Sequence, residues 1–143
     1  MHKTAKIFVI SILLVLLVGQ GYVFAKKCPE ETEVPLAKAM NPGFSDMYKK
    51  CDIVVIAEMS APSAEFYPFS IPYDHTVFEV VPPGFPYVGG KVHYHVIVPN
   101  EDAELVFQLK RGELVKLHGS VNILRYMQLR KTVFFTYKIE KMP

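Results

Sequence analysis

Hydrophobic and polar positions divide this chain of 143 residues into three stretches with different spacing. An apolar run, interrupted only by Ser11, extends from residue 7 to residue 18. Between residues 36 and 48 the apolar positions predict short helical turns, one at 36–40 and one with Phe44, Met47 and Tyr48 at i, i+3, i+4 spacing. From residue 52 onwards, β-branched runs and alternating positions predict strands instead. A mainly β domain is therefore expected after the first fifty residues.

Proline and glycine residues set the limits of several expected elements. Pro82-Pro83-Gly84 ends the second strand, and Gly89-Gly90 turns the chain into the third. Asn100 can cap a short helix that continues to Leu109. A loop rich in aromatic residues and proline is expected at 63–72. The five strands are expected at 53–57, 74–81, 91–98, 113–122 and 131–141.

The first twenty-five residues have the layout of a secretory signal peptide, with two early lysines, the apolar run and a small residue, Ala25, at the cleavage point. A membrane-spanning helix needs about 20 apolar residues, and Gln20 interrupts this one. We therefore expect cleavage before Lys26 and a periplasmic or secreted protein; an N-terminal membrane anchor is the alternative. The expected organisation is a signal peptide at 1–25, an arm with a short helix at 26–50, and a β domain at 51–143.

Charge and cysteine content narrow the picture further. Lys3 and Lys6 fall within the leader, so 14 of the 16 Lys and Arg residues remain, against 14 Asp and Glu residues. A chain without net charge is not expected to bind nucleic acid, which calls for a clustered positive excess. Cys28 and Cys51 are expected to pair in an oxidising compartment, the alternative being two separate thiols.

Five strands with a helix between the third and the fourth are the order of the oligonucleotide/oligosaccharide-binding (OB) fold. The segment FQLKRGELVKLHGSV, residues 107–121, resembles the helix, tight turn and fourth strand of OB domains, with Gly119 where that strand bends. The segment KTVFFTYKIEKM resembles the closing strand. The resemblance covers about 90 residues and implies an all-β, five-stranded Greek-key barrel.

A second resemblance concerns the start of the barrel. The segment YKKCDIVVIAE, residues 48–58, is similar to the start of netrin-like domains, which share the OB barrel and include the tissue inhibitors of metalloproteinases. Those inhibitors bind metal through a free N-terminal cysteine, whereas Lys26 and Lys27 precede Cys28 here and the dense disulfide framework is missing. Inhibition of that type is therefore not expected.

Alternation along the strands predicts which side chains fill the barrel. Pairing Phe78 with Tyr94 keeps the apolar faces of the second and third strands together. The residues expected to face the core are Thr76, Phe78, Val80, Val92, Tyr94, Val96, Val98, Val115, Leu117, Gly119, Val121, Val133, Phe135, Tyr137 and Ile139.

The same register predicts a patch of polar side chains outside the barrel. Glu79 would lie opposite His93, and His75 would be a diagonal neighbour of His95. Imidazoles with a carboxylate are the ligands that zinc or copper prefers, so a metal site formed by these four residues is one hypothesis. Ordinary solvated polar positions, with no cofactor, are the alternative that we favour. His118 is expected to be a separate surface histidine.

OB domains bind ligands on the second and third strands, between the loops that join strands 1–2 and 4–5. On this chain these loops carry aromatic and basic side chains, which stack on sugars or bases and hold anions. The alternative for the aromatic residues is that they fold back over an open end of the barrel. The expected ligand-binding residues are Phe66, Tyr67, Phe69, Arg125, Tyr126 and Arg130, with Lys131 beside them.

The sequence contains no nucleophile elbow, zinc-protease helix, Cys-x-x-Cys pair or phosphate-binding glycine loop. We therefore expect an exported, non-enzymatic binding module whose ligand is a glycan or a peptide. A periplasmic metal-binding protein and a structural subunit of an envelope assembly are the alternatives.

Overall fold

The computed structural model describes residues 27–84 and 92–143. The predicted signal peptide at 1–25, the Gly89-Gly90 turn and Lys91, where the third strand was expected to begin, lie outside these residues. Within the described part, no helix has the length and apolar character needed to cross a membrane.

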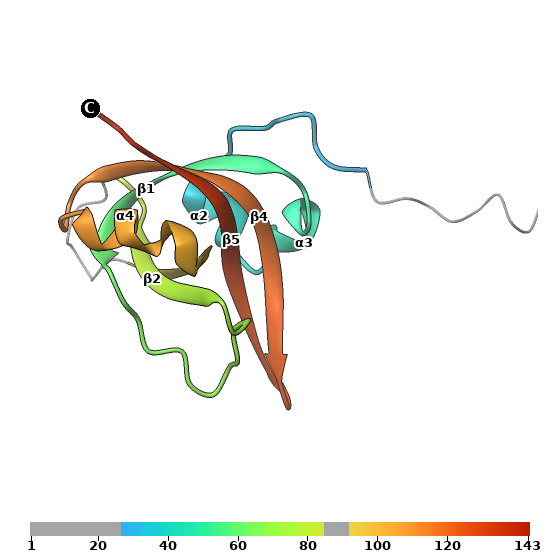
Figure 1. The fold of residues 1–143 in the computed structure, drawn as a ribbon. Coiled ribbons are helices and arrows are strands. Elements are labelled where there is room, and N and C mark those ends of the chain that lie inside the picture. Colours follow the sequence, from blue (N-terminus) through green and yellow to red (C-terminus); the bar gives the residue numbers. More distant parts are fainter. Residues whose placement is uncertain (1–26, 85–91) are drawn as a thin grey trace, which may run out of the picture.

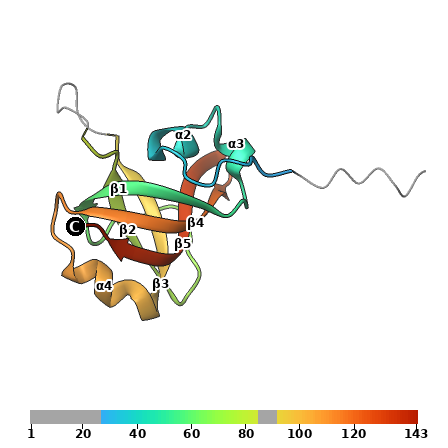
Figure 2. The ribbon, with the colours of Figure 1, turned by 90° about the horizontal axis from the view of Figure 1, so that it is seen from above.

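Five strands close into a barrel (Figures 1 and 2). Neighbours follow the order β1-β2-β3-β5-β4, and β4 also pairs with β1. All pairings are antiparallel except the one between β3 and β5. This arrangement confirms the predicted OB-like Greek-key barrel. The strands are β1 (Ile53–Ala61), β2 (His75–Val81), β3 (Tyr94–Pro99), β4 (Leu114–Tyr126) and β5 (Leu129–Lys141).

Short helices cover two sides of the barrel, as Figure 2 shows: α2 and α3 lie together on one side and α4 on the other. The predicted turn at 36–40 is confirmed as α2, and that around Phe44 as α3, although only Tyr48 of its three apolar residues is buried. Buried side chains from both sides join the barrel core. The helices are α2 (Leu36–Met40), α3 (Ser45–Tyr48), a 3₁₀ turn η1 (Asn100–Asp102) and α4 (Ala103–Gln108).

The disulfide between Cys28 and Cys51 is confirmed, with the two Cα atoms 5.7 Å apart. It anchors an N-terminal segment that belongs to the barrel: Val34 donates a backbone hydrogen bond to Val54 of β1 at 2.9 Å and is buried. The region expected to be an arm is thus a packed edge of the domain.

Most residues predicted to face the core do so, because strand alternation holds along β2, most of β3 and β4. Phe78, Val96 and Leu117 are fully buried in the main core. Val92 is an exception, since it precedes β3 and is 62% exposed.

The prediction for β5 was wrong at Val133, Phe135 and Tyr137. Gly119 pairs with Thr136 and His118 with Lys138, so Tyr137 is an extra residue in a β-bulge. The bulge reverses the alternation, which places Phe134 and Thr136 inside before it and Ile139 inside after it.

The predicted pairing of Phe78 with Tyr94 was also wrong, by two residues. Phe78 pairs with Val96 and Val80 with Tyr94. A shift of two positions leaves every side chain on its expected face, so hydrophobic patterning does not distinguish the two registers.

Gly119 is required by the close approach of β4 and β5. A Cβ atom built on this residue would lie 1.8 Å from the backbone oxygen of Phe135, and only movement of the backbone could relieve that clash.

We expect Gly119→Ala to lower the free energy of unfolding by about 3 kcal/mol, as overpacking of rigid sites does. Urea denaturation measures this. Gly43→Ala is the control, since its Cβ would meet only the side-chain oxygen of Asn41 at 3.3 Å. Equal loss in both variants would contradict the role assigned to Gly119.

Candidate nucleic-acid interface

The aromatic loop between β1 and β2 folds back onto the outside of the barrel. Three apolar residues on the outer faces of β2, β3 and β5, namely Val77, Ile97 and Val133, are buried there. The covering residues include Ala64 and Phe66. The alternative in which the aromatics fold back is therefore partly right, but they cover a strand face and not an open end of the barrel.

Phe66 packs against this second apolar cluster. Its ring centroid lies 5.5 Å from that of His95 on β3 and 5.8 Å from that of Phe69. The ammonium of Lys131 lies 5.4 Å from the Phe66 centroid and 6.0 Å from that of Phe69. A cation at this distance from aromatic rings is attracted by their negative faces. Phe66 and Phe69 are therefore occupied by contacts within the chain.

Burial disfavours the protonated, charged forms of Lys131 and His95. Burial lowers the pKa of Lys131, and the carboxylate of Glu79 partly opposes that effect. The pKa of His95 is lowered mainly by burial and further by Lys131, while Glu79 and a hydrogen bond to the backbone of Glu65 act in the opposite direction.

Two tyrosines of the same loop are open to solvent. Tyr67, which was predicted to bind ligand, is 94% exposed, and Tyr73 is fully exposed. The loop and the β4–β5 hairpin extend from the same end of the molecule in Figure 1.

The β4–β5 connection is a hairpin and not the loop that was expected. Its ladder continues to the pairs Arg125–Arg130 and Tyr126–Leu129, with a turn at Met127. Since side chains alternate along a strand, the two arginines share one face of the hairpin. Tyr126, Leu129 and Lys131 share the other. The predicted binding residues Arg125 and Arg130 therefore lie on the opposite face of the hairpin from Tyr126, although they were predicted to form one site.

The hairpin also carries a concentration of charge that sequence reasoning missed. Residues 114–139 include five Lys and Arg residues and no Asp or Glu. Counting charge along short windows, instead of over the whole chain, would have found this segment. Within the described residues, neither Arg125 nor Arg130 has a carboxylate partner.

In the structure His75 lies apart from the other three residues of the predicted histidine patch. Glu79 lies opposite His95 in the ladder and contacts His93 diagonally, with Oε1 3.2 Å from Nδ1. His75 lies opposite Pro99 and contacts Asp74 at 2.8 Å. No three potential metal ligands converge anywhere in the part of the chain that the structure covers. The predicted metal set of His75, Glu79, His93 and His95 is thus not assembled, because the register differs by two residues.

His118, expected to be a surface histidine, is partly buried. Its Nε2 lies 2.6 Å from Oε2 of Glu140, and its backbone oxygen accepts a hydrogen bond from Thr136 at 2.9 Å. It is therefore part of the β4–β5 framework.

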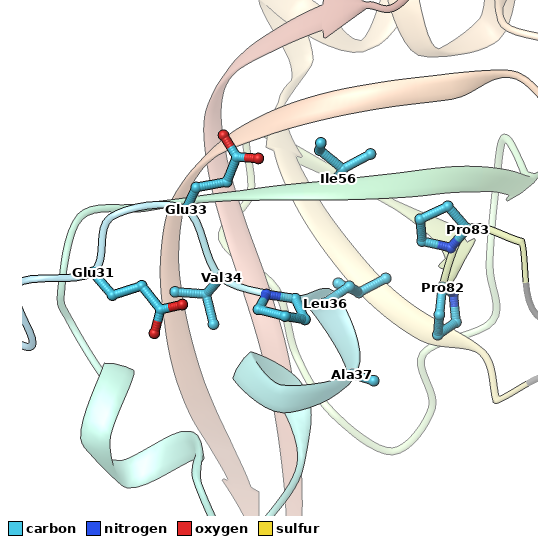
Figure 3. Close-up of a pocket in the computed structure, with 9 residues that line it drawn as sticks. Glu31, Glu33, Val34, Leu36, Ala37, Ile56, Pro82 and Pro83 are labelled. Carbon is cyan, nitrogen blue, oxygen red and sulfur yellow. The ribbon is translucent and has the colours of Figure 1, made fainter.

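A separate groove of about 490 Å³ lies between the N-terminal segment and β1. Figure 3 shows Glu31 and Glu33 at one end, Pro82 and Pro83 at the other, and Leu36 between them. The two carboxylates have lysine partners at 3.3 and 4.0 Å. None of the predicted binding residues lines this groove.

No family model matches the sequence, and no curated protein matches it. Solved structures do share the fold. Rim1, a mitochondrial single-stranded DNA binding protein from S. cerevisiae, has 12% identity and a TM-score of 0.46, and the match covers 66% of this chain and 95% of Rim1. The N-terminal domain of PriB from Thermoanaerobacter tencongensis has 19% identity and a TM-score of 0.42 over 64% of this chain and 96% of that one. A chain assigned as an aspartyl-tRNA synthetase from Leishmania major Friedlin has 10% identity and a TM-score of 0.52 over 89% of this chain and 25% of its own length.

The expectation of a glycan or peptide ligand, with nucleic acid disfavoured, is corrected. Nucleic acid was excluded because residues 26–143 hold 14 basic and 14 acidic residues, but that balance conceals a hairpin with an excess of positive charge. At this identity the likeness establishes the fold alone.

The lowered pKa of His95 makes stability depend on pH. The unfolded chain binds the proton more readily than the folded one, so this contribution to stability is present above the usual value of 6.5 and is lost as the pH falls below it. We expect the melting temperature to fall less between about pH 8 and pH 5.5 in His95→Gln than in the parent protein. Calorimetry at both pH values measures this, and identical falls in the two proteins would contradict it.

Proposed function

We propose that this domain binds single-stranded nucleic acid along the end of the barrel formed by residues 62–74 and the β4–β5 hairpin. The observation that carries the proposal is the hairpin itself, whose opposed Arg125 and Arg130 have no carboxylate partner among the described residues. Like charges directly opposite each other on a sheet repel, and a bound anion relieves that repulsion. Phosphates are bound well by guanidinium groups because the two match in geometry and charge.

Exposed aromatic side chains supply the second requirement. Tyr67 and Tyr126 are 94% and 42% exposed, and they lie on the loop and the hairpin that flank the second and third strands. Aromatic rings stack on the face of any base, so such contacts bind single strands without demanding a sequence. In this arrangement the phosphates of a bound strand lie near the arginines, on one face of the hairpin. Its bases lie near Tyr126 on the other face and near Tyr67 on the loop.

The domain acts in this proposal as a non-enzymatic binding protein that needs no cofactor. We further propose that it is exported and works outside the cytoplasm. The leader-like first twenty-five residues support export, as does the Cys28–Cys51 disulfide, because such bonds persist in oxidising compartments.

The arginine pair can be tested with matched substitutions. We expect Arg125→Gln combined with Arg130→Gln to weaken binding of a labelled oligothymidylate of about 15 nucleotides by tenfold or more, since each phosphate contact is charge-assisted. The dependence of log K on log salt should become shallower by about 0.7 for each phosphate that the variant no longer neutralises. Fluorescence anisotropy over a series of salt concentrations measures both effects.

Arg111→Gln is the control for this experiment, because Arg111 is exposed at the opposite end of β4 from the hairpin tip. Its affinity and salt dependence should match those of the parent protein. If the double variant binds as tightly as Arg111→Gln, the hairpin is not the phosphate contact.

The stacking role of Tyr67 gives a separate prediction. We expect Tyr67→Ala to weaken oligonucleotide binding by about 5- to 100-fold, the range for one stacked base. Thermal stability should change little because the side chain is almost fully exposed. Phe107→Ala on α4, which is 59% exposed, is the matched control and should bind normally. A large loss of stability in Tyr67→Ala would assign this residue to packing.

A further inference from the structure

The outer face of β2, β3 and β5 is apolar where an OB barrel receives its ligand. Val77, Ile97 and Val133 are 5%, 0% and 0% exposed, and the segment 62–73 packs over them. The surface proposed above for nucleic acid is therefore partly covered by the chain itself. The following inference rests on that proposed function and concerns how the same site is opened.

Few backbone hydrogen bonds hold the cover to the barrel. Among the described residues, the segment 62–73 makes one backbone-to-backbone hydrogen bond to the strand face beneath it, from the amide of Ala64 to the carbonyl of Val77 at 3.2 Å, and the His95 side chain adds a hydrogen bond to the backbone of Glu65. Phe69 donates to Phe66, within the segment, and Pro72 accepts from His75 where the chain enters β2. A segment with so few bonds to its support can open while the barrel remains folded.

The contacts of Phe66 are those that a nucleobase would make. Its ring lies against the imidazole of His95 and beneath the ammonium of Lys131, at 5.5 and 5.4 Å. Nucleic-acid bases are recognised by the same combination of stacking and a nearby cation. Among the described carboxylates, Glu79 acts on both cationic groups, so a phosphate would add a second anion beside them.

We propose that Phe66 holds the place of a base, and that single-stranded nucleic acid displaces residues 62–73 and seats one of its own bases between His95 and Lys131. Tyr67 then moves with the segment and stacks on the neighbouring part of the strand. A duplex does not compete for this site, because its bases are already stacked and paired.

The chain contains no tryptophan, so Phe66→Trp introduces a single fluorophore at the proposed position. When the oligothymidylate binds, as shown independently by anisotropy, the emission should move to longer wavelength as the introduced indole leaves the apolar cluster. Phe107→Trp, on exposed α4, should show no change. Binding without a red shift, or with quenching at constant wavelength, would overturn the displacement and make residue 66 a fixed contact.

A measurement on the parent protein without ligand keeps the inference independent of the proposed function. The amide of Ala64 should exchange its hydrogen at least about tenfold faster than the amides of the β4–β5 ladder, since the segment opens without unfolding the barrel. Equal exchange rates would overturn the inference. Rapid exchange with no oligonucleotide binding in any variant would instead overturn the proposed function and leave a mobile cover over an unassigned face.

Discussion

The long pairing between β4 and β5 is the constraint from which the other features of this domain follow. Twelve residue pairs join the two strands, from Val115–Lys141 to Tyr126–Leu129. The ladder closes the barrel on both sides of its bulge, because β4 pairs with β1 at residues 114–119 and β5 pairs with β3 at Phe134 and Phe135. Only the far end of the ladder continues past the barrel as a hairpin. The bulge lets both strands bend where Gly119 meets the backbone of β5.

The sheet buries apolar side chains on both of its faces over part of its area. Phe78 and Val96 fill the interior, while their neighbours Val77 and Ile97 are buried on the outside. Complete burial of such a side chain contributes about 1.5–3 kcal/mol, so the outer cluster holds the covering segment in place in the absence of a ligand. The contribution is small enough for favourable stacking and phosphate contacts to compete with it.

Hydrophobic spacing in the sequence was sufficient to predict the strands and the helix at α2, because these depend on local periodicity. The barrel and its topology were predicted from the resemblance to OB domains. Hydrophobic spacing was not sufficient for register, since Phe78 can face Tyr94 or Val96 with the same side chains inside. The bulge at Tyr137 has no local signature in the sequence, and Val133 and Phe135 were therefore predicted on the wrong face of β5. Tyr67 and the two arginines are exposed, as a binding role requires, and that role stays a prediction. The packing of Phe66 on His95 depends on a contact between distant residues that no spacing reveals.

The outer cluster also affects the response of the protein to proteolysis. Tyr67 projects almost entirely into solvent from the segment that shields Ile97 and Val133. Cleavage next to this tyrosine would leave the barrel closed but uncover an aliphatic strand surface, and such surfaces drive self-association. A cleaved molecule would therefore aggregate before its barrel unfolded.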